Sequence, residues 1–117
     1  MDLLECRNKL DVIDKQIVKL FEERMDICGK VAETKIATGK AVYDAEREKQ
    51  KLEAVSAMAG SDFNQIAVRE LFSQMMSISR KYQYSILAEH GRAMKLGFER
   101  LDKLPVEGVR VVHQGVE

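Results

Sequence analysis

The chain has 117 residues, of which 45% are hydrophobic and 32% are charged. This length is enough for one modest domain, and the hydrophobic fraction argues against disorder. Lys plus Arg and Asp plus Glu both number 19, and the resulting net charge of zero argues against a nucleic-acid binder. No apolar run reaches the length of a membrane span, and the charged start MDLLECRNKL is unlike a signal peptide.

The two cysteines, Cys6 and Cys28, fall within one predicted helix. At a rise of 1.5 Å per residue they would lie about 33 Å apart, which is too far for a disulfide within the chain. Neither belongs to a cluster with the spacing of a metal site. We therefore expect a reduced, cytoplasmic protein without a bound metal.

Apolar periodicity predicts an all-α protein with three helices, over about 3–38, 44–59 and 62–90. Asp2 and Glu5 form a capping box at the start of the first helix, and Gly39 suits its C-terminal cap. Gly60 is expected to end the second helix and Gly91 the third. No proline interrupts any of these segments.

The amino-acid composition changes after the third helix, where glycines and Pro105 interrupt the helical pattern. The segment VRVVHQGVE is typical of a short strand, yet one strand cannot form a sheet by itself. We expect residues 1–92 to form the helical domain. Residues 93–117 are then a linker and the first strand of a second, truncated domain.

The first helix is too long for the rest of the chain to cover. About 35 residues span about 52 Å, whereas a small domain is about 30 Å across. A heptad-like apolar seam runs along it, at Leu3, Cys6, Leu10, Ile13, Ile17, Leu20, Ile27 and Val31. Its overhanging turns need a second chain, and the simplest closed arrangement is an intertwined two-fold homodimer.

Cations break the seam of the first helix. Arg24 stands where the seam should continue, and Lys35, eleven residues later, returns to nearly the same face. One such cation is most often a side chain that reaches from the core edge to water. Two on one face would be costly to bury without partners, so an anionic ligand is the alternative.

Polar residues also enter the stripes of the other two helices. Glu48 occupies an apolar position of the second helix, although a carboxylate in a first turn also suits the helix dipole. Arg47 beside it does not by itself indicate a function. In the third helix, Ser79 and Gln83 replace core residues and share one face. They indicate either a helix–helix hydrogen bond or a polar site.

Taken together, these positions resemble the all-helical chorismate mutase family, from residue 3 to about residue 88. The resemblance depends on CRNKLDVIDKQIVKLFEERM, VAETK and VYDAEREK, followed by Ser79 and Gln83. It implies the pericyclic rearrangement of chorismate to prephenate in phenylalanine and tyrosine biosynthesis, without a cofactor. The tail VRVVHQGVE is similar to the opening strand of a prephenate dehydratase domain, which would make this chain the mutase part of a bifunctional protein.

The resemblance also implies catalytic roles. Lys35 and Gln83 would contact the ether oxygen of the breaking bond, and Arg24 would bind a substrate carboxylate. Arg7 would bind a carboxylate in the other subunit. It lies seventeen residues before Arg24, about 25 Å along the helix, so it cannot join Arg24 in one chain.

The remaining substrate contacts follow from the same resemblance. Ser79 would help to hold the ring carboxylate, Asp44 (through its backbone) and Glu48 would hold the ring hydroxyl, and Arg47 would line the pocket. Two other functions fit the same sequence. They are a non-catalytic helical dimerisation module, in which polar seam residues fix the register, and a regulatory domain that binds a small anion.

Overall fold

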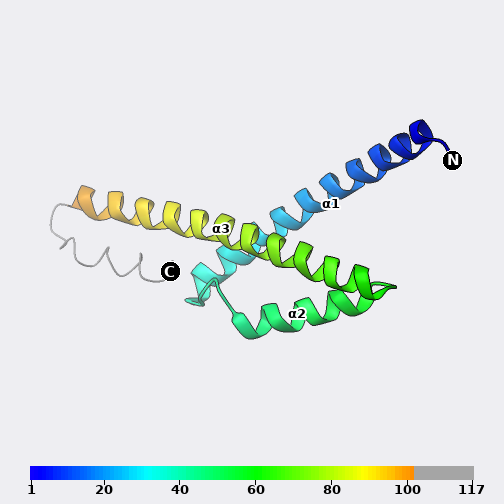
Figure 1. Cartoon of the computed structure of the whole chain (residues 1–117). Coiled ribbons are helices and arrows are strands. Elements are labelled where there is room, and N and C mark those ends of the chain that lie inside the picture. Colours follow the sequence, from blue (N-terminus) through cyan, green and yellow to red (C-terminus); the bar gives the residue numbers. More distant parts are fainter. Residues whose placement is uncertain (102–117) are drawn as a thin grey trace.

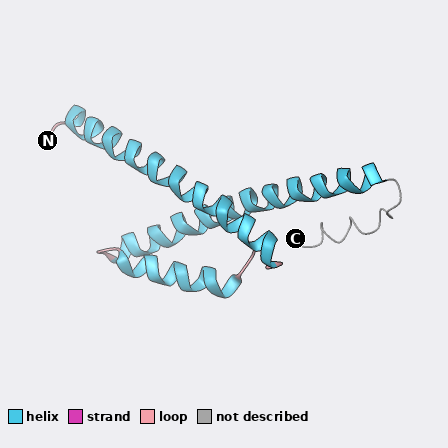
Figure 2. Ribbon diagram, turned by 180° about the vertical axis from the view of Figure 1, so that it is seen from behind, coloured by secondary structure: helices cyan, strands magenta, loops and turns pink. Residues whose placement is uncertain are grey.

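A computed structural model describes residues 1–101, which form three α-helices joined by short loops (Figure 1). The helices are α1 (Leu3–Thr38), α2 (Ala45–Met58) and α3 (Asp62–Leu101). No strand occurs among these residues, as the colouring by secondary structure shows (Figure 2). The prediction of an all-α fold with a long first helix is confirmed.

Local capping explains where the helices begin and end. The Asp2 carboxylate accepts a hydrogen bond from the Glu5 N–H at 2.8 Å, which satisfies one of the free donors at the start of α1. Gly39 ends α1 with φ at +71°, a left-handed conformation that glycine adopts without steric cost. At the start of α3 the Ser61 hydroxyl accepts from the Asn64 N–H at 3.2 Å.

The predicted end of the third helix near residue 90 is wrong, because α3 continues through Gly91 and Gly97 to Leu101. A glycine inside a helix costs only about 1 kcal/mol relative to alanine, so it weakens a helix without ending it. A proline would end it, and the first proline after α3 is Pro105. Position 93, the expected start of the linker, therefore lies inside α3. The predicted strand over 109–117 lies outside the described residues.

The third helix is the centre of the arrangement, because α3 packs against both α1 and α2. Helix α2 runs back beside the first half of α3, and α1 crosses α3 obliquely (Figures 1 and 2). A small residue lies at the crossing. A Cβ atom added at Gly29 would stand 3.3 Å from the Tyr82 ring, so the two helices approach closely here.

The single chain buries few apolar side chains. Those of the described residues are Ala32, Val42, Val55 and Met76. The apolar seam of α1 does not face α3: Leu10 is 55% exposed, Ile17 57% and Ile27 60%. The N-terminal half of α1 extends away from the other two helices (Figure 1). Within residues 1–101, no helix is apolar and long enough to cross a membrane.

Candidate active site

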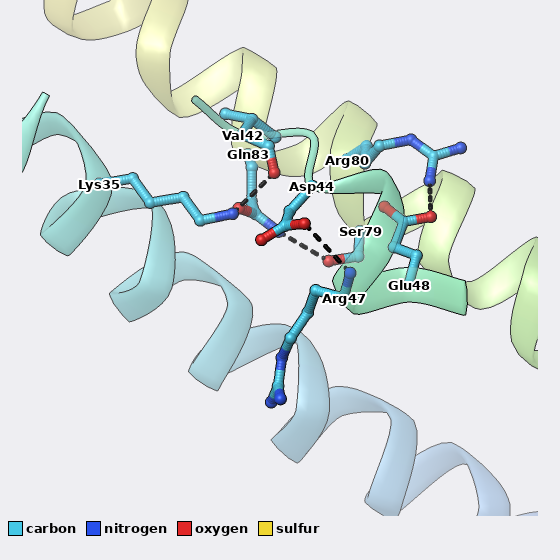
Figure 3. Close-up of polar contacts among 8 residues, drawn as sticks. All are labelled: Lys35, Val42, Asp44, Arg47, Glu48, Ser79, Arg80 and Gln83. Carbon is cyan, nitrogen blue, oxygen red and sulfur yellow. Dashed lines mark hydrogen bonds and ion pairs between the residues drawn. The ribbon is translucent and has the colours of Figure 1, made fainter. Parts of the chain in front are cut away.

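A pocket of about 220 Å³ opens where the three helices meet. Seven of the eight residues predicted for the site line it. They are Arg24 and Lys35 from α1, Asp44, Arg47 and Glu48 at the start of α2, and Ser79 and Gln83 from α3. Figure 3 shows six of them around the loop that leads into α2. The fold therefore brings together residues that are up to 59 positions apart, from Arg24 to Gln83.

The pocket also contains residues that sequence reasoning missed. These are Cys28, Val31, Val42, Lys51, Met76 and Arg80. Cys28 follows Arg24 by one turn, and Arg80 adjoins Ser79 in the chain, so both stand next to predicted positions. Neither interrupts an apolar row, which is the signal that identified the others.

Positive charge dominates the pocket. Five cations line it, namely Arg24, Lys35, Arg47, Lys51 and Arg80. Only two carboxylates, those of Asp44 and Glu48, stand among them, so three positive charges are in excess. A pocket with this balance attracts small anions that carry more than one negative charge.

Lys35 reaches from α1 to the loop before α2. Its Nζ donates a hydrogen bond to the carbonyl oxygen of Val42 at 2.7 Å (Figure 3). Val42 itself is only 6% exposed, so this bond joins α1 to a buried point of the loop. An ammonium group has three N–H donors, and two of them remain for a ligand.

Ser79 and Gln83 lie on the pocket face of α3 and contact each other. The Gln83 Nε2 donates to the Ser79 Oγ at 3.0 Å, and the Ser79 hydroxyl donates to the Sγ of Cys28 at 3.0 Å. The contact between Ser79 and Cys28 joins α3 to α1, so a helix–helix hydrogen bond, one of the two alternatives for these residues, is present. The Oε1 of Gln83 is buried without a protein partner. Such an atom costs about 1–3 kcal/mol, and a bound ligand could offset that cost.

Arg24 lies on α1 next to Cys28, the residue that contacts Ser79. Its Nη1 lies 3.9 Å from the Sγ of Cys28, and its guanidinium stands 6.0 Å from the centre of the Phe72 ring. The side chain therefore lies near both a thiol and an aromatic face, with its cation at the pocket wall.

The first turn of α2 carries the acidic part of the site. Asp44 caps the helix, and its Oδ1 accepts from the Arg47 N–H at 3.1 Å. The Glu48 carboxylate accepts a hydrogen bond from the Arg80 guanidinium of α3, which also stands 5.0 Å from the centre of the Tyr43 ring. Asp44 and Glu48 thus support the local structure and line the pocket at the same time.

Arg7 is the one predicted residue that does not line the pocket. It is exposed in the first turns of α1, about 25 Å along the helix from Arg24. The sequence prediction that these two residues cannot meet within one chain agrees with this placement. Among residues 1–101, no three His, Cys, Asp or Glu side chains gather in a group that could hold a metal ion.

The chain thus belongs to the class of small all-α proteins, with a cation-rich pocket between its helices. Over residues 6–84 the chain matches the family described as chorismate mutase type II, and it belongs to that family. It is 33% identical over 96 residues to a bifunctional chorismate mutase/prephenate dehydratase of Buchnera aphidicola from Acyrthosiphon pisum. That match covers 80% of this chain and 25% of the relative.

Two other relatives are also similar to this chain. The bifunctional chorismate mutase/prephenate dehydratase of Enterobacter agglomerans is 30% identical over 103 residues, which cover 82% of this chain and 26% of the relative. A protein named chorismate mutase from Methanocaldococcus jannaschii is 47% identical over 47 residues, 40% of this chain and 48% of the relative. The chain spans about a quarter of the length of the bifunctional relatives. No solved structure matches it significantly.

Proposed function

We propose that this chain catalyses the rearrangement of chorismate to prephenate. The observation that carries the proposal is the pocket itself. Seven residues chosen from the sequence for this chemistry line one cavity, and that cavity has three positive charges in excess. Chorismate carries two carboxylates, which need cations, and one ring hydroxyl, which needs a polar partner.

The reaction suits a site of this composition. It is intramolecular: an ether C–O bond breaks while a C–C bond forms between the two ends of the same molecule. No nucleophile, base or redox partner takes part in it, so positioning and electrostatics are the means of catalysis. Arg24 on one carboxylate and Lys35 on the other would select the compact conformer in which the two carbons meet.

Lys35 and Gln83 would stabilise the negative charge that grows on the ether oxygen. Lys35 has N–H groups left after its bond to Val42. Gln83 has two N–H groups on Nε2: one donates to the Ser79 Oγ, and the second would donate to the ether oxygen.

The remaining contacts would fix the ring of the substrate. Ser79 would bind the ring carboxylate. The backbone of Asp44 and the carboxylate of Glu48 would hold the ring hydroxyl, and Arg47 would complete the wall. Asp44 is the N-cap of α2 and Glu48 stands in its first turn, close to the loop that Lys35 contacts.

The active form would be a homodimer with intertwined first helices. The exposed seam of α1 supports this, because a row of side chains such as Ile13 (49% exposed) and Ile17 (57% exposed) calls for a partner. A second copy has the same seam, and two seams can pack against each other under two-fold symmetry. Arg7 would then enter the partner's pocket and bind a carboxylate there.

We place this activity in the cytoplasm, in phenylalanine and tyrosine biosynthesis. The names of the bifunctional relatives favour a dehydratase domain beyond the mutase part. For this chain, residues 93–101 belong to α3, and the first dehydratase strand in the remainder of 93–117 stays a prediction.

The direct test is the loss of chorismate absorbance with purified protein, with prephenate identified as the product. We expect turnover far above the uncatalysed rate. Binding of chorismate without turnover would favour the regulatory alternative, and a dimer that neither binds nor converts it would favour the dimerisation module.

A further inference from the structure

The ion pair between Arg80 and Glu48 links α3 to the first turn of α2 across the pocket (Figure 3). Both side chains are partly buried, with 28% of the Arg80 side chain and 22% of the Glu48 side chain exposed. The guanidinium also lies over the face of Tyr43, with its Cζ 5.0 Å from the ring centre. Arg80 therefore contacts both an aromatic ring and a carboxylate.

We propose that Arg80 is a positioning residue that fixes Glu48 for the ring hydroxyl of the substrate, an inference that rests on the proposed function. The guanidinium donates to one carboxylate oxygen, Oε1. The second oxygen, Oε2, is left to accept a hydrogen bond from the hydroxyl. A carboxylate held at one oxygen has fewer rotamers, so less entropy is lost when the substrate binds.

Arg80 also keeps Glu48 away from another cation. Lys51 stands three residues after Glu48 on the same helix, where oppositely charged side chains can pair, and it lines the same pocket. Without Arg80, Glu48 would be free to pair with Lys51. It would then leave the hydroxyl and neutralise a charge that attracts the substrate.

The aromatic contact explains why an arginine suits this position. A planar guanidinium can lie on the Tyr43 ring and still direct an N–H group at Glu48, whereas an ammonium group is a point charge on a flexible chain. Arg80→Lys keeps the charge and is expected to restore only part of the function. Lys81, the next residue, is exposed and does not line the pocket, so Lys81→Met is a matched control.

The experiment compares two substrates, chorismate and the analogue in which hydrogen replaces the ring hydroxyl. We expect Arg80→Met to lower kcat/KM for chorismate about tenfold to a hundredfold, the range that a hydrogen bond to a charged group represents. It should lower kcat/KM for the deoxy analogue much less, since that substrate loses only the attraction of the pocket charge, so the preference for the hydroxyl shrinks. The ratio of the two values does not depend on the folded fraction of the variant.

A double-mutant cycle adds a second readout. If Arg80 acts through Glu48, the variant carrying both Arg80→Met and Glu48→Gln should be no slower than Glu48→Gln alone. Additive losses, or an unchanged preference for the hydroxyl in Arg80→Met, would overturn the role of Arg80 while leaving the mutase proposal intact. A wild-type chain without any turnover would instead overturn the proposed function, and the role of Arg80 with it.

Discussion

Two inactive variants should restore each other's activity if the site is shared between subunits. Arg7 is exposed, lies outside the pocket of its own chain, and stands about 25 Å along α1 from Arg24. Arg7→Ala alone should be nearly inactive, because every site then lacks that cation. Lys35→Ala should be nearly inactive as well, because every site lacks a donor to the ether oxygen.

Refolding the two variants together in equal amounts should return roughly a quarter of wild-type activity. Random pairing makes about half of the dimers mixed under two-fold symmetry. In a mixed dimer, the Arg7→Ala chain keeps its own Lys35 and receives an intact Arg7 from its partner. That site is complete, while the second site lacks both residues. One working site in two, in half of the dimers, gives the quarter.

The assay is chorismate turnover of the refolded mixture, with the mixed dimers counted by native mass spectrometry. The matched control combines Lys35→Ala with Gln83→Ala. Both residues line the pocket of a single chain, so pairing these variants completes no site and should restore nothing. If verified mixed dimers of Arg7→Ala and Lys35→Ala stay inactive, Arg7 acts within its own subunit or not at all, and the shared site is wrong.

Two further variants test the donor and the dimer. A carboxyl group donates a hydrogen bond only when it is protonated. Gln83→Glu should therefore be most active in acid and lose activity as pH rises through the pKa of the new carboxyl group. A flat pH profile would contradict a donor role for Gln83. Ile13→Asp puts a charge in the exposed seam of α1 and should give inactive monomers of 13.3 kDa by sedimentation, whereas the polar-face control Lys15→Asp should stay dimeric. An active Ile13→Asp dimer would place the interface elsewhere.

The helix boundaries that sequence reasoning predicted correctly depend on local chemistry. Asp2 and Gly39 cap α1 by contacts within a few residues, which a sequence pattern can reveal. For α3, the sequence prediction used Gly91 as the end of the helix. Gly91 disfavours a helix only slightly, so its presence could not fix the boundary.

The site was predictable where a polar residue interrupts an apolar row, as Ser79 and Gln83 do in α3. Both are buried in the structure, at 6% and 7% exposure. Arg80 interrupts no row, and its partner Glu48 lies 32 residues away on another helix, so only the three-dimensional arrangement reveals the pair. The sequence also predicts only part of the exposure of the α1 seam. It predicts that the overhanging turns of this seam need a partner, and in the structure α3 contacts α1 near Gly29 and leaves most of the seam exposed, not only those turns.

The pocket between the three helices is the proposed site of the reaction, and a comparison of two lysines on α1 tests this assignment. Lys35 lines the pocket, whereas Lys30 is exposed on the same helix outside it. Conversion of chorismate to prephenate should be followed by proton NMR for the wild type, Lys35→Ala and Lys30→Ala, after thermal melting has shown that all three are folded. We expect Lys35→Ala to lose about a hundredfold or more in kcat, the usual effect of removing a donor to a developing oxyanion, and Lys30→Ala to match the wild type. Equal rates for all three folded proteins would contradict the assignment of this pocket as the active site.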